Sequence, residues 1–130
     1  MFIRSLALGL ASSMLLVSNV AAASQPTSDL QLLVTVTNTS HVCQRFDASG
    51  GMDMRMDEMP IPPYLQREAA PGATVTFEGL NGHFATVAAN PHETADCTSK
   101  MTGVFYRYPK PVVRVKLSFD GNAFHLVKNL

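Results

Sequence analysis

The sequence predicts an all-β fold, namely a small antiparallel β-sandwich or barrel of about six or seven strands with one disulfide. Apolar and polar residues alternate with a period of two in several short segments of residues 24–130, which is typical of strands that bury one face. Glycine, proline, asparagine and aspartate separate these segments, as turns do in such folds. Helical spacing of apolar residues is persuasive nowhere in this region.

The N-terminal residues 1–23 have the three parts of a secretory signal peptide. A short start with one basic residue, Arg4, precedes the mostly apolar run Leu6–Val20, and Ala21–Ala23 supply the small residues of a cleavage site. The apolar run is shorter than the roughly 20 residues that cross a bilayer. We therefore expect cleavage, leaving residues 24–130 as a single secreted β domain.

The charge of residues 24–130 limits the classes of function. Without Arg4, the chain has nine Lys and Arg against ten Asp and Glu, a net charge of about −1 with neutral histidines. Nucleic-acid binders and electrostatic membrane binders need a basic excess. We therefore expect no nucleic-acid partner, and no transmembrane segment remains after signal cleavage.

The first three predicted strands follow from local alternation. In residues 30–36, leucine and valine occupy every second position. The second strand follows an Ala-Pro-Gly turn, and in it Val75 and Phe77 alternate with Thr74, Thr76 and Glu78. The third, residues 84–89, follows an Asn-Gly turn.

The remaining predicted strands lie near the C-terminus. Residues 104–108 alternate Val, Tyr and Tyr with other residues and end at Pro109. Residues 113–119 and 123–128 flank an Asp-Gly-Asn turn, which predicts a β-hairpin.

Residues 24–130 contain two cysteines, Cys43 and Cys97. A signal peptide directs them to an oxidising compartment, so we predict that they form a disulfide. Closing a loop of about 55 residues stabilises the fold by roughly 4 kcal/mol in the chain-entropy model. A redox pair and a pair of metal thiolates are the alternatives, but no CxxC spacing supports either.

A loop rich in methionine and proline is predicted at about residues 44–72. Glycines stand at 50 and 51, and prolines stand at 60, 62 and 63. These residues favour an exposed, adaptable loop over a helix.

Four methionines of this region, Met52, Met54, Met56 and Met59, are candidate metal ligands. Thioether sulfur is a soft, uncharged ligand that suits Cu(I), and it has no proton to lose on binding. The MxM and MxxM spacings resemble the methionine-rich segments of periplasmic copper-handling proteins, over about a tenth of residues 24–130. This resemblance implies Cu(I) binding. His41 or His83 could complete the ligand set.

Two alternatives remain open for the same residues. The alternation in Met-Asp-Met-Arg-Met also fits an edge strand with one face on the core. The methionines could instead form an adaptable protein-binding or oxidation-sensitive surface. In that case Met59, Ile61 and Tyr64 are the candidate partner-binding residues.

No enzyme motif is recognisable, so we predict a non-enzymatic protein. Four histidines are scattered; His92, beside Pro91, is most simply a loop residue, and His125 is most simply an exposed residue of the last strand. The sequence therefore predicts a periplasmic or secreted binding protein with a Cu(I) candidate site. The alternative is a protein-interaction module, such as an inhibitor, an immunity-type protein or a secreted surface-binding protein, that uses the same loop.

Overall fold

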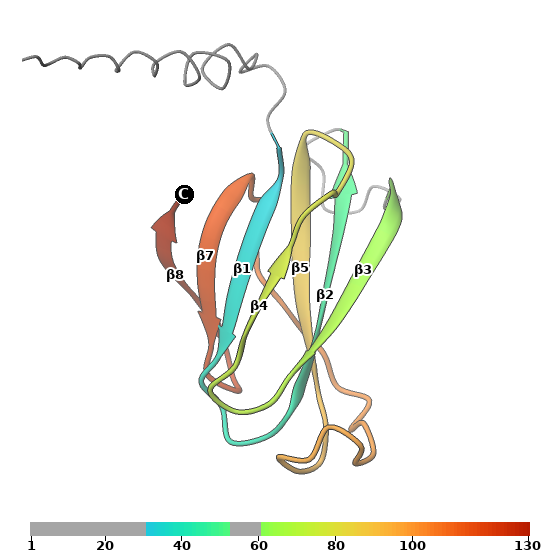
Figure 1. Ribbon diagram of the computed structural model, residues 1–130, viewed down its shortest axis with the longest axis vertical. Coiled ribbons are helices and arrows are strands. Elements are labelled where there is room, and N and C mark those ends of the chain that lie inside the picture. Colours follow the sequence, from blue (N-terminus) through green and yellow to red (C-terminus); the bar gives the residue numbers. More distant parts are fainter. Residues whose placement is uncertain (1–30, 53–60) are drawn as a thin grey trace, which may run out of the picture. The chain divides into compact units, whose positions relative to one another are not determined.

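Two four-stranded sheets pack face to face in the computed structural model, which describes residues 31–52 and 61–130 (Figure 1). All described residues belong to one compact unit, Gln31–Leu130. The strands are β1 Leu33–Asn38, β2 Gln44–Gly51, β3 Ile61–Ala69, β4 Thr74–Phe77, β5 Phe84–Pro91, β6 Tyr106–Arg107, β7 Arg114–Phe119 and β8 Phe124–Asn129.

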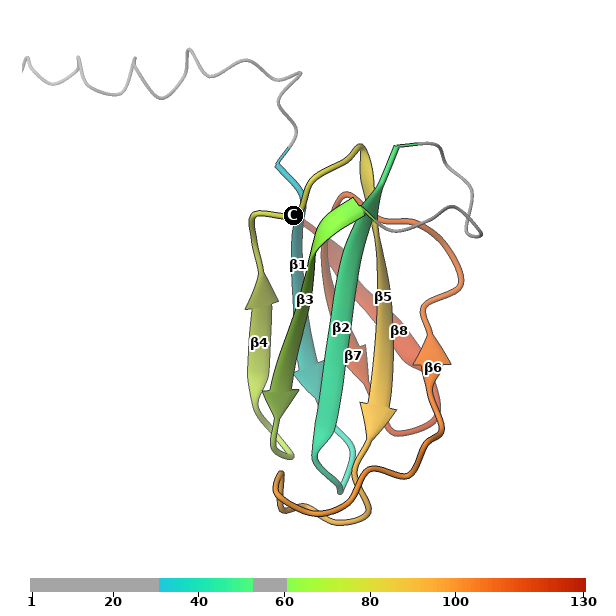
Figure 2. The ribbon, with the colours of Figure 1, turned by 90° about the vertical axis from the view of Figure 1, so that its right-hand side faces the viewer.

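The fold is a β-sandwich with one disulfide, as the sequence predicts. One sheet has the order β4-β1-β7-β8 and the other has the order β3-β2-β5-β6 (Figure 2). Among the described strands, β1 and β7 pair in parallel, whereas the other pairs are antiparallel. The parallel pair joins two strands that are distant in sequence and lie side by side.

The core lies between the two sheets and follows the predicted alternation. In β1, Val34 and Val36 are fully buried, while the residues between them are only partly buried. Phe119 of β7 is fully buried, and its ring centroid lies 4.7 Å from that of Phe124 and 6.1 Å from that of Phe46. The aromatic side chains therefore join β2 of one sheet to β7 and β8 of the other.

The predicted C-terminal hairpin is confirmed as β7 and β8, which pair from Phe119 and Phe124 outwards. Its turn contains Gly121 at φ 102°, a left-handed conformation that glycine adopts without steric cost. His125 is exposed, as predicted, and its Nε2 lies 2.8 Å from Asp120 Oδ2. The turn chemistry and the period of two were sufficient to predict this element.

The prediction of a continuous loop over about residues 44–72 is wrong at both ends, because β2 and β3 occupy most of this range. In β2, Phe46 and Ala48 face the core and alternate with partly buried polar residues. The prolines of β3 are accommodated because β3 is an edge strand, where missing N–H donors are tolerated. The Pro62-Pro63 peptide bond is cis.

The strand predicted at residues 104–108 is much shorter in the structure. Only Tyr106 and Arg107 form β6, which pairs with Ala88 and Ala89 of β5. Val104 and Phe105, which the prediction placed in the strand, are 50% and 57% exposed. The apolar pattern of this segment therefore extends beyond the paired residues onto the surface.

Candidate functional site

The end of β2 is pressed against the turn that precedes β5. A Cβ atom added to Gly50 would lie 1.6 Å from the carbonyl oxygen of Asn81, and one added to Gly51 would lie 2.5 Å from the Phe84 ring. Gly50 and Gly51 are therefore strand residues that allow close approach, not loop residues. The sequence predicts them in the loop because glycine is common both in loops and at strand positions of close approach.

This turn contacts residues on both sides of the methionine segment; the segment itself, residues 53–60, lies outside the described residues. At the first end, the backbone N–H of His83 donates to Gly51 O at 2.7 Å. His83 Nδ1 lies 3.1 Å from Met52 O. At the second end, Asn81 Nδ2 donates to Pro62 O at 2.8 Å. Met52 and Pro62, on the two sides of the segment, are therefore held by one short turn.

The contact to Met52 defines the orientation of the His83 imidazole. A carbonyl oxygen can only accept a hydrogen bond, so Nδ1 carries a hydrogen, and in the neutral ring the lone pair is then on Nε2. Histidine ligands of metals commonly donate their other ring N–H to such a carbonyl. His83 is exposed, and Met52 is 49% exposed at the same place. The arrangement is suited to a metal ligand at Nε2.

Of the four predicted methionine ligands, the structure describes one. Met52 is exposed at the end of β2, so it does not face the core as the edge-strand alternative requires. Met54, Met56 and Met59 lie outside the described residues. Of the two candidate histidines, His83 contacts Met52, whereas His41 precedes the opposite end of β2.

The predicted partner-binding residues differ in exposure. Tyr64 is 57% exposed on the edge strand β3. Ile61 is partly buried and pairs with Gly50 across the two strands. Met59 lies outside the described residues. Tyr64 is thus the described member of this set that is most accessible to a partner.

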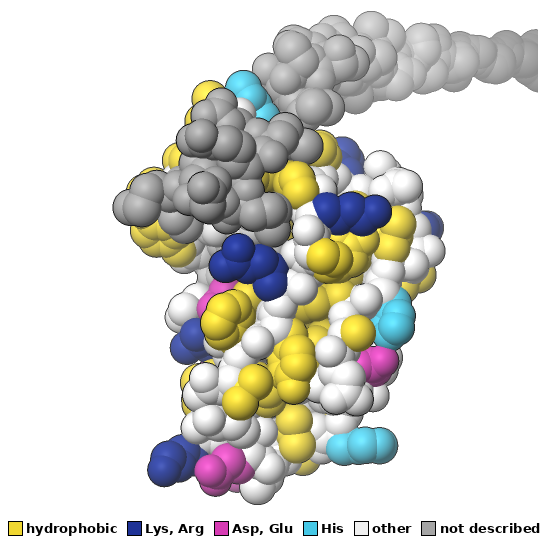
Figure 3. Space-filling model, turned by 180° about the vertical axis from the view of Figure 1, so that it is seen from behind, with side chains coloured by type: hydrophobic (Ala, Val, Ile, Leu, Met, Phe, Trp, Pro, Cys, Tyr) yellow, Lys and Arg dark blue, Asp and Glu magenta, His cyan; other side chains and the backbone are white. Residues whose placement is uncertain are grey.

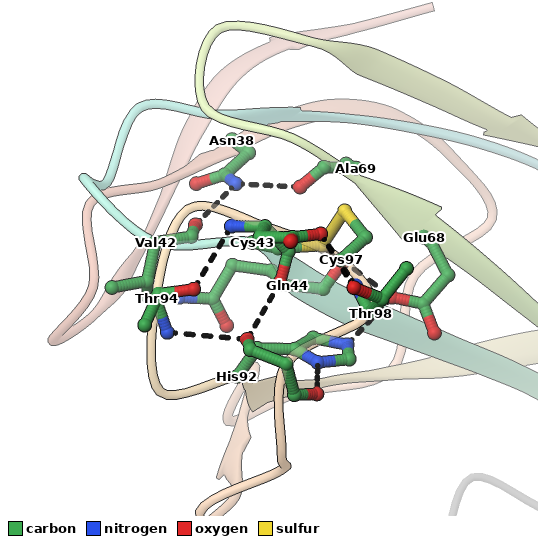
Figure 4. The surroundings of a disulfide bond; sticks show 12 residues. Asn38, Val42, Cys43, Gln44, Glu68, Ala69, His92, Thr94, Cys97 and Thr98 are labelled. Carbon is green, nitrogen blue, oxygen red and sulfur yellow. Dashed lines mark hydrogen bonds and ion pairs between the residues drawn. A yellow bond between two sulfur atoms is a disulfide. The ribbon is translucent and has the colours of Figure 1, made fainter.

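The predicted disulfide between Cys43 and Cys97 is present, with the two Cα atoms 5.2 Å apart (Figure 4). It joins the residue before β2 to the loop of residues 93–101, at the end of β2 opposite Gly51. In the same loop, hydrogen bonds from the backbone N–H and the hydroxyl of Thr98 lower the pKa of Asp96.

His92 is not the simple loop residue that the sequence predicts. It directly follows β5, forms a bridge with Met101, and its side chain is only 4% exposed. Its Nδ1 lies 2.8 Å from Ser99 O and its Nε2 lies 2.7 Å from Glu68 Oε1. The loop that carries Cys97 folds back over this imidazole, and such a return is not visible in a local sequence pattern.

Glu68 of β3 brings the disulfide and His92 into one cluster. Its Oε1 lies 3.4 Å from Cys43 Sγ, and the ligand atoms of Cys43, Glu68 and His92 all lie within 4.8 Å of one another. The members of this cluster lie in separate segments, since Cys43 precedes β2, Glu68 lies in β3 and His92 follows β5, so no local sequence pattern joins all three. The short spacing between His92 and Cys97 was the one local signal that could have indicated it.

A buried polar network lies beneath the disulfide. Gln44 is fully buried and its Nε2 donates to Ser40 Oγ at 3.1 Å. The Nδ2 group of Asn38, also fully buried, donates to Val42 O and Ala69 O. These bonds hold the start of β2 between β1 and the end of β3, and thus fix the position of Cys43.

No protein-family model matches the chain, and comparison with curated proteins and with solved structures finds no significant match. Within residues 31–52 and 61–130, no helix is both long and apolar enough to cross a membrane.

Proposed function

We propose that this protein is an exported, non-enzymatic β-sandwich that binds Cu(I) at its methionine segment, with His83 as an additional ligand. The observation that carries the proposal is the contact between His83 Nδ1 and the Met52 carbonyl, which leaves Nε2 as the metal-binding nitrogen. The exposed side chain of Met52 lies at the same end of the segment.

The chemistry of the segment supports this choice of ion. Thioether and imidazole are donors that suit Cu(I), and thioether suits Zn(II), Mg²⁺ or Ca²⁺ poorly. The segment contains three acidic residues, at 53, 57 and 58, and one arginine, at 55. Its net charge is therefore negative and does not repel a cation. Because thioethers bind without losing a proton, their part of the affinity does not depend on pH, whereas His83 must be neutral to bind.

The proposal includes export through cleavage after residue 23 to the periplasm or the exterior. The disulfide supports this part, because disulfides persist in oxidising compartments. The disulfide would stabilise the β-sandwich that carries the methionine segment.

Anaerobic titration with Cu(I) against a competing chelator tests the proposal. We expect one ion per chain and loss of binding when Met52, Met54, Met56 and Met59 are all replaced by leucine, which removes sulfur but keeps apolar volume. His83→Ala should weaken binding about 10-fold or more. His41→Ala is the matched control, since His41 is also exposed but lies at the other end of β2. Unchanged affinity in the four-leucine variant would refute Cu(I) binding by this segment.

A second candidate function, protein interaction, is favoured by the open edge of the sandwich at β8. Among the described strands, β8 pairs only with β7. Three apolar side chains in β8 or directly after it are exposed, Leu126 at 46%, Val127 at 52% and Leu130 at 43%. Figure 3 views the protein from behind Figure 1 and shows hydrophobic side chains along the middle of that face, with basic side chains beside them.

An open groove of about 480 Å³ borders β8, and its lining includes Tyr108, Val113 and Leu126 together with Lys110 and Arg114. An extended peptide that alternates apolar and acidic residues would pair with the edge backbone and match these charges. Fluorescence anisotropy with such a peptide tests this candidate. Leu126→Asp should abolish binding, and a peptide with lysine in place of the acidic residues should bind more weakly. Equal binding of the acidic and basic peptides would contradict it.

A further inference from the structure

We propose that reduction of the Cys43–Cys97 disulfide creates a Zn(II) site formed by Cys43, Cys97, His92 and Glu68. This inference is independent of the methionine segment, which lies at the opposite end of β2. Figure 4 shows that His92 and Glu68 lie beside the disulfide. The ligand atoms of Cys43, Glu68 and His92 are within 4.8 Å of one another, and Cys97 is covalently joined to Cys43.

The orientation of His92 is that of a metal ligand. Its Nδ1 donates to the carbonyl oxygen of Ser99 at 2.8 Å, so its Nε2 has the lone pair or a second proton. Nε2 faces Glu68 Oε1 at 2.7 Å. At this distance Nε2 and Oε1 form a hydrogen bond, so one hydrogen lies between them in the oxidised protein. Zn(II) would take the place of this hydrogen between the two atoms.

The disulfide blocks this site in the oxidised protein. A sulfur atom in a disulfide is not a thiolate, and the thiolate is the form of cysteine that binds metals. His92 and Glu68 alone provide two donors, which is fewer than a tetrahedral zinc site requires. The oxidised protein should therefore bind Zn(II) weakly at this position.

Reduction supplies the two missing ligands in a balanced reaction. A dithiol reductant transfers two electrons and two protons to the S–S bond, which breaks to give two cysteine thiols, while the dithiol becomes a disulfide. Zn(II) then binds both sulfurs and releases their two protons, together with the proton between His92 and Glu68. Two thiolates, one imidazole and one carboxylate are donors that tetrahedral Zn(II) accepts.

Backbone hydrogen bonds keep these ligands together after the disulfide is broken. Cys43 N donates to Thr94 O at 2.9 Å, and His92 N donates to Cys43 O at 2.8 Å. Glu93 N donates to Lys100 O at 2.8 Å and closes the base of the loop that carries Cys97. Since Glu68 is 47% exposed, the cluster also has an opening through which an ion can enter.

Zinc binding to the whole exported chain, before and after treatment with a phosphine reductant, tests the inference. We expect one Zn(II) per reduced chain by competition with a chromogenic chelator, and at least 10-fold weaker binding by the oxidised chain. With Co(II) as the probe, the reduced chain should show thiolate-to-metal charge-transfer absorption. If reduction alone unfolds the chain, added Zn(II) should restore the β-sheet circular dichroism.

Variants separate this site from other donors. Glu68→Gln removes a half-exposed ligand and should weaken binding by the reduced chain, and Cys43→Ala with Cys97→Ala should abolish it. His125→Ala, which changes an exposed imidazole at the β7–β8 turn, should leave the affinity unchanged. Equal affinity of the oxidised and reduced chains would overturn the proposal. So would a reduced chain that neither binds Zn(II) nor refolds with it.

Discussion

Asp120 is held at the β7–β8 turn by hydrogen bonds to both of its carboxylate oxygens. Oδ2 lies 2.8 Å from His125 Nε2, and Oδ1 accepts from the backbone N–H groups of Asn122 and Ala123. The bond to His125 is the largest cause that lowers the pKa of Asp120 from 3.8 to about 2, and the two backbone bonds lower it further. The charged form of Asp120 is therefore favoured in the folded protein.

The lowered pKa predicts a pH-dependent contribution to stability. Because the pKa is lower in the folded protein, the contribution is fully present above pH 3.8 and is lost as the pH falls through about 2. Asp120→Asn, which keeps an oxygen acceptor but removes the charge, should lower the thermal midpoint at neutral pH and have a smaller effect near pH 2. Thermal unfolding of both proteins across this range measures the difference, which we expect to be modest because the site is exposed. A difference that stays constant with pH would contradict the assignment.

At the scale of elements, the predicted strands differ from the missed strand β2 in the volume of their inward-facing side chains. β1 and β7 place valine, leucine and phenylalanine at every second position, and this pattern was recognised. β2 has the same period, but its inward residues decrease in size from Phe46 to Ala48 to Gly50. The decrease reflects the turn packed against the end of β2, and such a long-range contact cannot be inferred from alternation.

The close approach at Gly50 predicts a costly substitution. In Gly50→Ala, the new Cβ would meet the backbone of Asn81, so the turn must move, at about 1 to 3 kcal/mol of unfolding free energy. The displaced turn carries His83, so Cu(I) affinity should fall as well. Urea unfolding measures the first effect and chelator competition measures the second.

Gly72→Ala serves as the comparison for this prediction. Gly72 has φ 87° and nothing within 4 Å of an added Cβ, so the variant isolates the cost of a left-handed conformation, about 1 kcal/mol. Cu(I) affinity should not change in it. If Gly50→Ala were as stable as the unchanged protein, the turn would not be held against β2 as the structure indicates.

At the scale of the whole molecule, the sequence predicted the fold class and the disulfide but only part of the candidate sites. The methionine segment is recognisable from composition, whereas the contact between Met52 and His83 joins residues 31 positions apart. The pair of His92 and Glu68 spans 24 positions and depends on how β3 and β5 flank β2. Contacts of this kind depend on strand pairing across the sheet, which single-sequence periodicity does not determine.

The parallel pairing of β1 with β7 has a consequence for the order in which the protein can fold. β1 pairs on one side with β4, which begins at Thr74, and on the other side with β7, which begins only at Arg114, so its sheet is incomplete until most of the chain has been made. Long-range pairing of this kind slows folding. A chain made from its N-terminus would therefore lack the β1–β7 pairing, and with it one complete sheet, until synthesis is nearly finished.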